Sequence, residues 1–187
     1  MSDVENDCLV SVDGTDFRVE EPYPYERIWS KRWFVSKFKG AGLRYEVAVS
    51  IIRGDIVWIN GPFAPGIYND LKIFLECGLA SMLEENERVE ADDGYFSADP
   101  QFAKARSGSW HPQQSLHIRN TVRARHETVN SRFKFYGALR HTFKHGVLKH
   151  QEVFQAVAVL VQLQIENGKP LFLIKDYNDS KWYSGTN

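Results

Sequence analysis

Residues 44–60, RYEVAVSIIRGDIVWIN, are the stretch of this sequence that decides its fold. Residues 44–52 are rich in β-branched side chains and partly alternate between polar and apolar, and residues 56–60 form a second such run. Gly54-Asp55 lies between the two runs and is a signal for a tight turn. The sequence therefore predicts two antiparallel strands joined as a hairpin.

The segments on either side extend this hairpin into a larger sheet. Residues 8–19, CLVSVDGTDFRV, predict a first strand that bends at Gly14 and then continues. Residues 70–83 predict a helix capped by Asn69 or Asp70, because the side chains of both residue types accept hydrogen bonds from the first turn of a helix.

The second half of the chain predicts one more strand and two long helices. Residues 88–92 indicate a short strand after the helical crossover, whereas residues 93–117 carry no assignable pattern. Helices are expected over residues 118–140 and 150–167, and the second should end at Gly168. Three antiparallel strands followed by a strand reached through a helix form an α/β fold, a mixed sheet with helices packed on it.

Length and composition indicate one ordinary globular domain. The chain has 187 residues, and we place the domain at residues 8–175, between an acidic extension at residues 1–7 and a tail at residues 176–187. No apolar run is long enough to cross a membrane and the N-terminus has no signal-peptide pattern, so we expect an intracellular protein, nuclear in a eukaryote. Cys8 and Cys77 fit no metal-binding or redox spacing.

Charge is distributed unevenly along the chain. Residues 101–150 hold ten basic side chains and a single acid, although the net charge of the whole sequence is −1. We interpret the histidines of this segment as part of the same basic face; they are His111, His117, His126, His141, His145 and His150. Such asymmetry indicates a polyanionic partner or, alternatively, a solvated basic surface.

Glu127 is that single acid, and two further acids complete a candidate catalytic set. Asp13 ends an apolar run in the first strand, and Asp92 ends the strand after the crossover. Carboxylates from three separate elements can converge at one edge of a sheet, where they would hold two divalent cations for phosphodiester cleavage. Asp16 could replace Asp13, and Asp93 could replace Asp92, although strand alternation favours Asp92. Each of these acids could instead be an ordinary turn residue.

The helix around Glu127 has a polar face. Arg123, Glu127, Asn130 and Lys134 follow one another at i, i+4, i+7 and i+11, so they share one side of the helix. A carboxylate between two cations could hold a metal ion while the cations bind DNA phosphates. The alternative is a surface face with one ordinary ion pair between Glu127 and Arg123.

Taken together, the motifs resemble the DDE transposases of the Harbinger type and their bacterial insertion-sequence relatives. The resemblance covers nearly the whole chain, and five stretches carry it in the family's order. They are Val12-Asp13-Gly14-Thr15; Ser36-Lys37-Phe38-Lys39 followed by Leu43-Arg44-Tyr45-Glu46; the loop from Gly61-Pro62 to Asn69-Asp70; Ala91-Asp92-Asp93-Gly94-Tyr95; and the spaced residues Arg123, Glu127 and Lys134.

This resemblance implies an RNase H-like fold and a two-metal endonuclease that excises and reinserts DNA. Asp13, Asp92 and Glu127 would be the catalytic residues and also the ligands of two Mg²⁺ or Mn²⁺ ions. The side chains that would bind DNA are Arg123, Lys134, Lys37 and Lys39. Besides DNA, the implied partners are a separate DNA-recognition protein and a second copy of the chain in a homo-oligomer.

The sequence departs from the family at two places. Asn120 stands where the family signature has a tyrosine, and the residues before Asp13 leave no room for the usual N-terminal helix-turn-helix domain. Two functions are therefore open. One is an active endonuclease or transposase, and the other is a truncated or domesticated domain that binds DNA or protein without cutting.

Overall fold

The structure of the chain is a computed structural model. The residues that it describes are 8–21, 30–83, 87–95, 105–106 and 116–174. The extension at residues 1–7 and the tail at residues 176–187 therefore lie outside the described residues, as does most of the segment from 93 to 117. Among the helices of the described part, none is long and apolar enough to cross a membrane.

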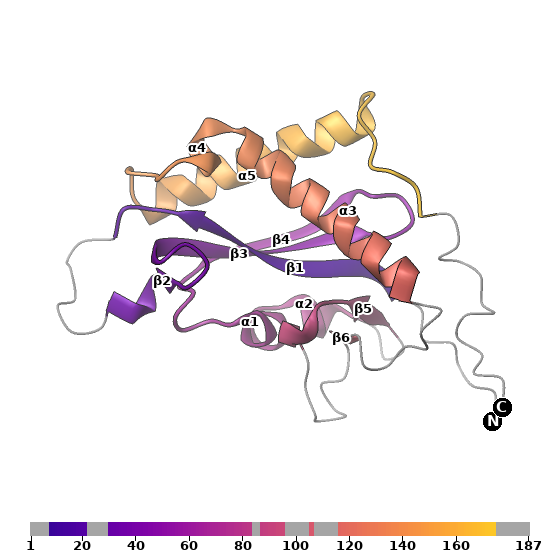
Figure 1. Ribbon diagram of the computed structural model, residues 1–187, viewed down its shortest axis with the longest axis horizontal. Coiled ribbons are helices and arrows are strands. Elements are labelled where there is room, and N and C mark those ends of the chain that lie inside the picture. The colour runs from indigo at the N-terminus through magenta and orange to yellow at the C-terminus, as the bar shows by residue number, and fades with distance from the viewer. Residues whose placement is uncertain (1–7, 22–29, 84–86, 96–104, 107–115, 175–187) are drawn as a thin grey trace.

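In the described part of the chain, six strands form one mixed sheet (Figure 1). They are β1 (Cys8–Arg18), β2 (Phe34–Val35), β3 (Gly40–Ser50), β4 (Ile56–Phe63), β5 (Arg88–Glu90) and β6 (Ala105–Arg106). Their order is β2-β3-β1-β5-β6, with β4 also paired to β3. β3 is antiparallel to β1 and β4, whereas β5 is parallel to β1 and β6 is parallel to β5. The predicted mixed α/β sheet is confirmed.

The predicted hairpin lies at the centre of this sheet. β3 pairs with both β1 and β4, so neither of its edges is free along most of its length. Its apolar run Val47, Ala48, Val49 is buried because helices cover both faces of the sheet. Val47 and Val49 pack in the core cluster on one face, and Ala48 packs in the cluster on the other.

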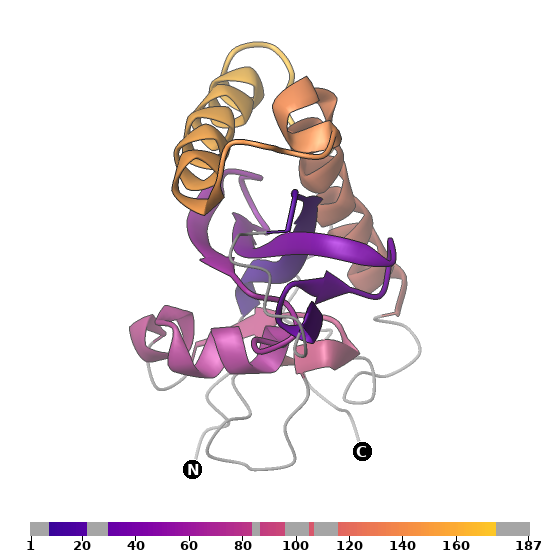
Figure 2. The ribbon, with the colours of Figure 1, turned by 90° about the vertical axis from the view of Figure 1, so that its left-hand side faces the viewer.

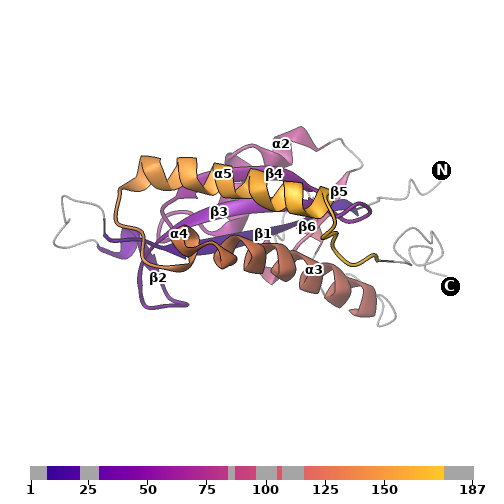
Figure 3. The same ribbon diagram turned by 90° about the horizontal axis from the view of Figure 1, so that it is seen from above.

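Two helical layers cover these faces (Figures 1 and 2). On one face lie α1 (Asp70–Glu76) and α2 (Leu79–Met82), and on the other lie α3 (Leu116–Phe135), α4 (Gly137–Arg140) and α5 (Val147–Glu166). Figure 3 shows α3 and α5 running next to each other over the second face. Two 3-10 turns complete the described elements, η1 (Ser30–Arg32) and η2 (Asp93–Tyr95).

Two of the predicted helices are broken in the structure. The helix expected at residues 70–83 is divided into α1 and α2, because the chain turns at Gly78, whose φ of 123° suits glycine. The helix expected at residues 118–140 ends at Phe135, since Tyr136 is extended and α4 begins after it. The predicted end of the last helix at Gly168 is confirmed by the φ of 94° at that residue.

The predicted bend at Gly14 is wrong. β1 runs through Gly14 without interruption, pairing Asp13 with Val47 and Gly14 with Glu46 on β3. The glycine has another physical reason, because a Cβ atom at this position would collide with the carboxylate of Asp70. Gly14 therefore allows α1 to approach the sheet, and Asp13 lies within a strand instead of at its broken end.

Candidate active site

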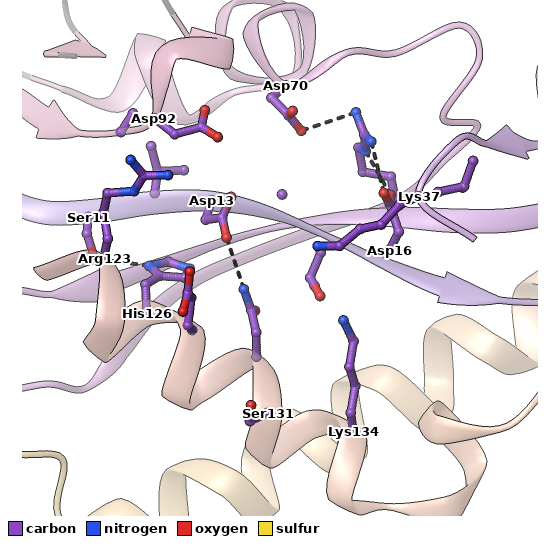
Figure 4. Close-up of a pocket in the computed structure, with 18 of the residues that line it drawn as sticks. Ser11, Asp13, Asp16, Lys37, Asp70, Asp92, Arg123, His126, Ser131 and Lys134 are labelled. Atoms are coloured by element: carbon purple, nitrogen blue, oxygen red, sulfur yellow. Dashed lines mark hydrogen bonds and ion pairs between the residues drawn. The ribbon is translucent and has the colours of Figure 1, made fainter. Parts of the chain in front are cut away.

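A pocket of about 620 Å³ opens where β1, the end of β5 and α3 meet (Figure 4). Six of the residues predicted to act in catalysis or DNA binding line it: Asp13, Asp92, Glu127, Arg123, Lys134 and Lys37. Lys39 does not line the pocket; it is exposed, at a positive φ of 50°, in the turn before β3. The fold thus gathers residues that are more than a hundred positions apart in the sequence.

The pairing of β1 with β5 places Asp13 beside Asp92. The two strands are parallel, and Ser11 lies opposite Glu90. Two residues further along come Asp13, still within β1, and Asp92, just after the end of β5, and the charge of Asp92 acts on Asp13. All four side chains line the pocket. The side chain of Asp93, the alternative to Asp92, lies outside the described residues.

Asp13 is a largely buried carboxylate that faces other carboxylates. Its Oδ2 accepts a hydrogen bond from Nδ2 of Asn130 on α3, at 3.0 Å. Burial, and then the charges of Asp92 and Asp70, raise the pKa of Asp13 from 3.8 to about 7. A bound cation would act in the opposite direction, so the site favours positive charge next to Asp13.

A short turn after β5 holds Asp92. The backbone N–H of Gly94 donates to Oδ1 of Asp92 at 2.8 Å, which fixes one of the two carboxylate oxygens. A Cβ atom at position 94 would lie 2.9 Å from that same oxygen. The spacing Asp-x-Gly therefore has a local cause, because glycine permits the carboxylate to fold back onto the turn.

The predicted polar face of α3 forms one wall of the pocket. Arg123, Glu127, Asn130 and Lys134 all line it, and the neighbouring side of the helix is buried through Val122, Val129 and Phe133. Glu127 is exposed, and no ion pair found in the described part of the chain joins it to Arg123. Its carboxylate therefore faces the pocket without the ion pair that the alternative interpretation requires.

Basic side chains stand on both sides of Asp13. Arg123 lies on the side of Asp92, and Lys37 and Lys134 lie together on the other side (Figure 4). Burial lowers the pKa of Lys134, and the neighbouring charge of Lys37 lowers it further. Two ammonium groups in one place favour an anionic ligand, so this end of the pocket suits a phosphate group.

Asp70 is a site residue that the sequence did not reveal. It is the first residue of α1, and the helix cap is Asn69, whose Oδ1 accepts the backbone N–H of Lys72 at 2.8 Å. The carboxylate of Asp70 reaches the pocket and lies 3.2 Å from Nη1 of Arg44. Burial raises its pKa, against the opposing effect of Arg44. An acid at the start of a helix is typical of an N-cap, so the sequence alone does not distinguish a capping residue from one that lines the pocket.

Asp16, the alternative to Asp13, has a different environment. Nε and Nη2 of Arg44 donate to its two carboxylate oxygens at 2.8 and 3.0 Å. Asp16 also lines the pocket, but its charge is neutralised by this bidentate ion pair. Asp13 is the better candidate for a metal ligand, because it lies near Asp92 and no ion pair in the described part of the chain joins it to a cation.

The interpretation of residues 101–150 as one basic face is wrong for three of its side chains. Arg125 is buried, and its Nη1 donates to the backbone oxygen of Ile51. His126 and His150 are also buried, and burial lowers the pKa of each to about 4, so neither is charged at neutral pH. The amphipathic pattern alone did not reveal that these polar side chains belong to the core.

Neither a preformed group of metal ligands in the described residues nor similarity to a known protein identifies the function of the pocket. Among the described residues, no group of three or more His, Cys, Asp or Glu side chains is arranged to hold a metal ion as it stands. Comparison with protein-family models, with curated proteins and with solved structures finds no match for this chain. The function must therefore be inferred from the chemistry of the pocket.

Proposed function

We propose that this chain is the catalytic domain of a metal-dependent DNA endonuclease of the DDE transposase type, with an RNase H-like fold. The supporting observation is that Asp13, Asp92 and Glu127, from three separate elements, line one pocket. The sheet supports the fold assignment, because three antiparallel strands precede a strand that is parallel to the first and is reached through helices.

The donor set of the pocket fits Mg²⁺ or Mn²⁺. Asp13 and Asp92 both line the pocket, and burial, followed by repulsion from Asp92, raises the pKa of Asp13. Hard divalent cations prefer carboxylate oxygens and keep several waters, so these two acids and a substrate phosphate suffice for one ion. Glu127 on the facing wall would hold the second. When bound, the two ions would stabilise the attacking and leaving oxygens of an in-line phosphodiester displacement.

The protein's own residues would bind and orient the DNA. Arg123 lies on one side of Asp13, and Lys37 and Lys134 lie on the other, so these three side chains would hold successive phosphates. Lys39, outside the pocket, would contact the phosphate backbone of the DNA at a more distant nucleotide. Such an enzyme would act with a separate recognition protein or a second copy of itself, in the nucleus if it is eukaryotic.

The decisive test is nicking of supercoiled plasmid by the purified protein with Mg²⁺ or Mn²⁺. Glu127→Gln keeps the shape of the side chain and removes its charge, so nicking should be lost while DNA affinity survives. The matched control is Glu152→Gln, an exposed acid on α5 that does not line the pocket and should cut normally. Equal cutting by wild type and Glu127→Gln would refute the assignment of Glu127.

A second candidate function is a transposase-derived domain that binds DNA without cutting it. One observation favours it, namely that no three potential ligands in the described residues are arranged around a single ion. This domain would bind DNA through the same basic side chains, so wild type and Glu127→Gln would bind equally and neither would nick. If neither protein nicks the plasmid with Mg²⁺ or with Mn²⁺ although both bind DNA, the endonuclease proposal is refuted and this alternative is supported.

A further inference from the structure

Two buried polar atoms on α3 have no hydrogen-bond partner within the described residues. They are Nε2 of His126 and Oδ1 of Asn130. The two residues are one helical turn apart, so their side chains are neighbours on the helix surface, and both line the pocket. A buried polar atom without a partner destabilises the folded protein. Two such atoms side by side therefore require an explanation.

The opposite ends of both side chains are already bound to β1. Nδ1 of His126 lies 3.0 Å from the hydroxyl oxygen of Ser11. Nδ2 of Asn130 donates to Oδ2 of Asp13 at 3.0 Å. With its nitrogen toward Asp13, the amide of Asn130 leaves Oδ1 as an acceptor on the other side.

We propose that Ser11, His126 and Asn130 form a hydrogen-bonded chain that positions the carboxylate of Asp13. Ser11 donates to Nδ1 of His126, and the Nε2–H of His126 donates to one water molecule, which in turn donates to Oδ1 of Asn130. Asn130 then donates to Asp13. This inference rests on the proposed function for its purpose, and it makes His126 and Asn130 positioning residues of the same site.

The chain also fixes the tautomer of His126. The ring is 3% exposed and neutral, so only one of its nitrogens carries a proton. In the opposite tautomer, Nδ1–H would donate to Ser11, whose hydroxyl would turn to the backbone oxygen of Val49 at 3.4 Å. Nε2 would then be a second acceptor facing Oδ1 of Asn130, and the water between them would donate to both atoms. Only the Nε2–H tautomer gives a chain in which every donor points toward Asp13, an arrangement in which the hydrogen bonds strengthen one another.

The spacing of the four residues supports a closed arrangement. Ser11 and Asp13 are two residues apart on one face of β1, a separation of roughly 6.6 Å along a strand. His126 and Asn130 are four residues apart on α3, a rise of roughly 6 Å along a helix. The matching lengths allow α3 to bind β1 at two points, and this arrangement fixes the place of Asp13 between them.

The tautomer can be measured without metal or substrate. Long-range ¹H–¹⁵N NMR of the imidazole nitrogens in the wild-type protein at neutral pH should show His126 protonated at Nε2 and unprotonated at Nδ1. Ser11→Ala should leave Nε2 protonated but alter the Nδ1 resonance. An Nδ1–H tautomer, or a doubly protonated ring, would overturn the hydrogen-bonded chain.

The effect on Asp13 can be measured as Mn²⁺ affinity by calorimetry. His126→Leu and Asn130→Ala should each weaken Mn²⁺ binding roughly tenfold, as removal of residues that orient a ligand commonly does. His126→Gln retains an N–H donor near the position of Nε2 and should restore most of that affinity. Thr128→Ala, whose hydroxyl bonds Ala124 away from the pocket, is the control and should bind normally.

The outcomes separate the two proposals. If His126→Leu lowers the melting temperature but leaves Mn²⁺ affinity at the wild-type value, His126 is merely structural and the positioning role is refuted. If Asp13→Asn itself leaves Mn²⁺ affinity unchanged, the metal site of the proposed function fails, and the NMR result alone then decides the hydrogen-bonded chain.

Discussion

Two pairs of acids lie close together near Gly14, and they differ in what neutralises them. Asp16 and Asp70 share the guanidinium of Arg44, at 2.8 and 3.2 Å. No ion pair of the described residues joins Asp13 or Asp92 to a cation, and burial, followed by the charge of Asp92, raises the pKa of Asp13. The first pair holds β1, β3 and α1 together, whereas the second pair opposes folding as long as no cation is bound.

The two pairs thus differ in electrostatic energy: the charges of Asp16 and Asp70 are compensated, whereas those of Asp13 and Asp92 are left in mutual repulsion. Arg44 compensates the charge of Asp16, and a buried charge without such a partner is strongly destabilising. Leaving Asp13 against Asp92 is the kind of local conflict that proteins retain at functional sites. The predictions below test this contrast by removing the cation, the neighbouring acid or the acid itself.

Arg44→Met should have the largest effect on stability. The substitution keeps most of the apolar stem but leaves Asp16 and Asp70 without their cation in a largely buried place, which should cost about 3 kcal/mol. Urea denaturation followed by circular dichroism measures this loss. The control is Arg53→Ala, which removes a largely exposed ion pair with Asp55 and should cost less than about 1 kcal/mol.

An equal loss in the two variants would contradict the contrast. It would mean that the Arg44 pairs are screened by solvent as the Arg53 pair is, and that Asp16 and Asp70 need no cation. The difference between the two acid pairs would then lie in geometry and not in charge.

Glu46→Gln should stabilise the protein at alkaline pH. Glu46 lies opposite Gly14 on β3, fully buried, and accepts a hydrogen bond from Trp58 Nε1 at 3.1 Å. Burial raises its pKa from 4.5 to about 7, so the folded protein holds a proton that the unfolded chain releases. Wild-type stability should therefore fall as the pH rises from 4.5 to 7, and the full cost should remain above 7.

The glutamine variant removes this dependence and keeps an acceptor for Trp58. At pH 8 it should be about 2 kcal/mol more stable than the wild type, and at pH 4 the two should be nearly equal. Thermal melts across this pH range measure the difference. A constant gap at all pH values would show that packing, and not charge, distinguishes the variant.

Asp13→Asn and Asp16→Asn should change stability in opposite directions. In metal-free buffer at pH 8, Asp13→Asn removes a charge whose pKa burial, Asp92 and Asp70 raise to about 7, so it should add about 1–2 kcal/mol. Asp16→Asn breaks the bidentate pair with Arg44 and should cost about 1–2 kcal/mol. Chemical denaturation measures both, and two losses of the same size would remove the distinction between the acid pairs.

Much of the fold was predictable because local rules and the tertiary structure agree. The hairpin follows from apolar runs around Gly54-Asp55, and the two faces of α3 follow from helical periodicity. The convergence of Asp13 with Asp92 depends on the parallel pairing of β1 and β5. A helical crossover is compatible with a parallel strand, but it does not determine which strand of the sheet that strand joins.

Other features depend on contacts that no local pattern encodes. Gly14 resembles a bend, but it makes room for Asp70, which approaches from a helix more than fifty residues later in the sequence. His126 and Arg125 resemble parts of a basic surface, but their partners Ser11 and Ile51 lie on or just after strands of the sheet. Polar residues on helices are mostly exposed, so the burial of these two becomes evident only from their tertiary hydrogen-bond partners.

The smallest expected effect concerns DNA binding and extends the comparison to the cations of the pocket. Lys134 lies beside Lys37 in the pocket and carries no carboxylate partner in an ion pair of the described residues. It is therefore available for a phosphate, unlike Arg44, which is occupied by Asp16 and Asp70.

Lys134→Ala should weaken binding of all DNA sequences about equally, by roughly fivefold at moderate salt. Fluorescence anisotropy should also show that the slope of log affinity against log salt becomes smaller by about 1, because one phosphate contact is lost. Lys149→Ala, an exposed lysine on α5 from the same basic segment but outside the pocket, should leave the slope unchanged. If the two variants lower the slope equally, DNA follows the whole basic surface and the pocket has no special part in holding it.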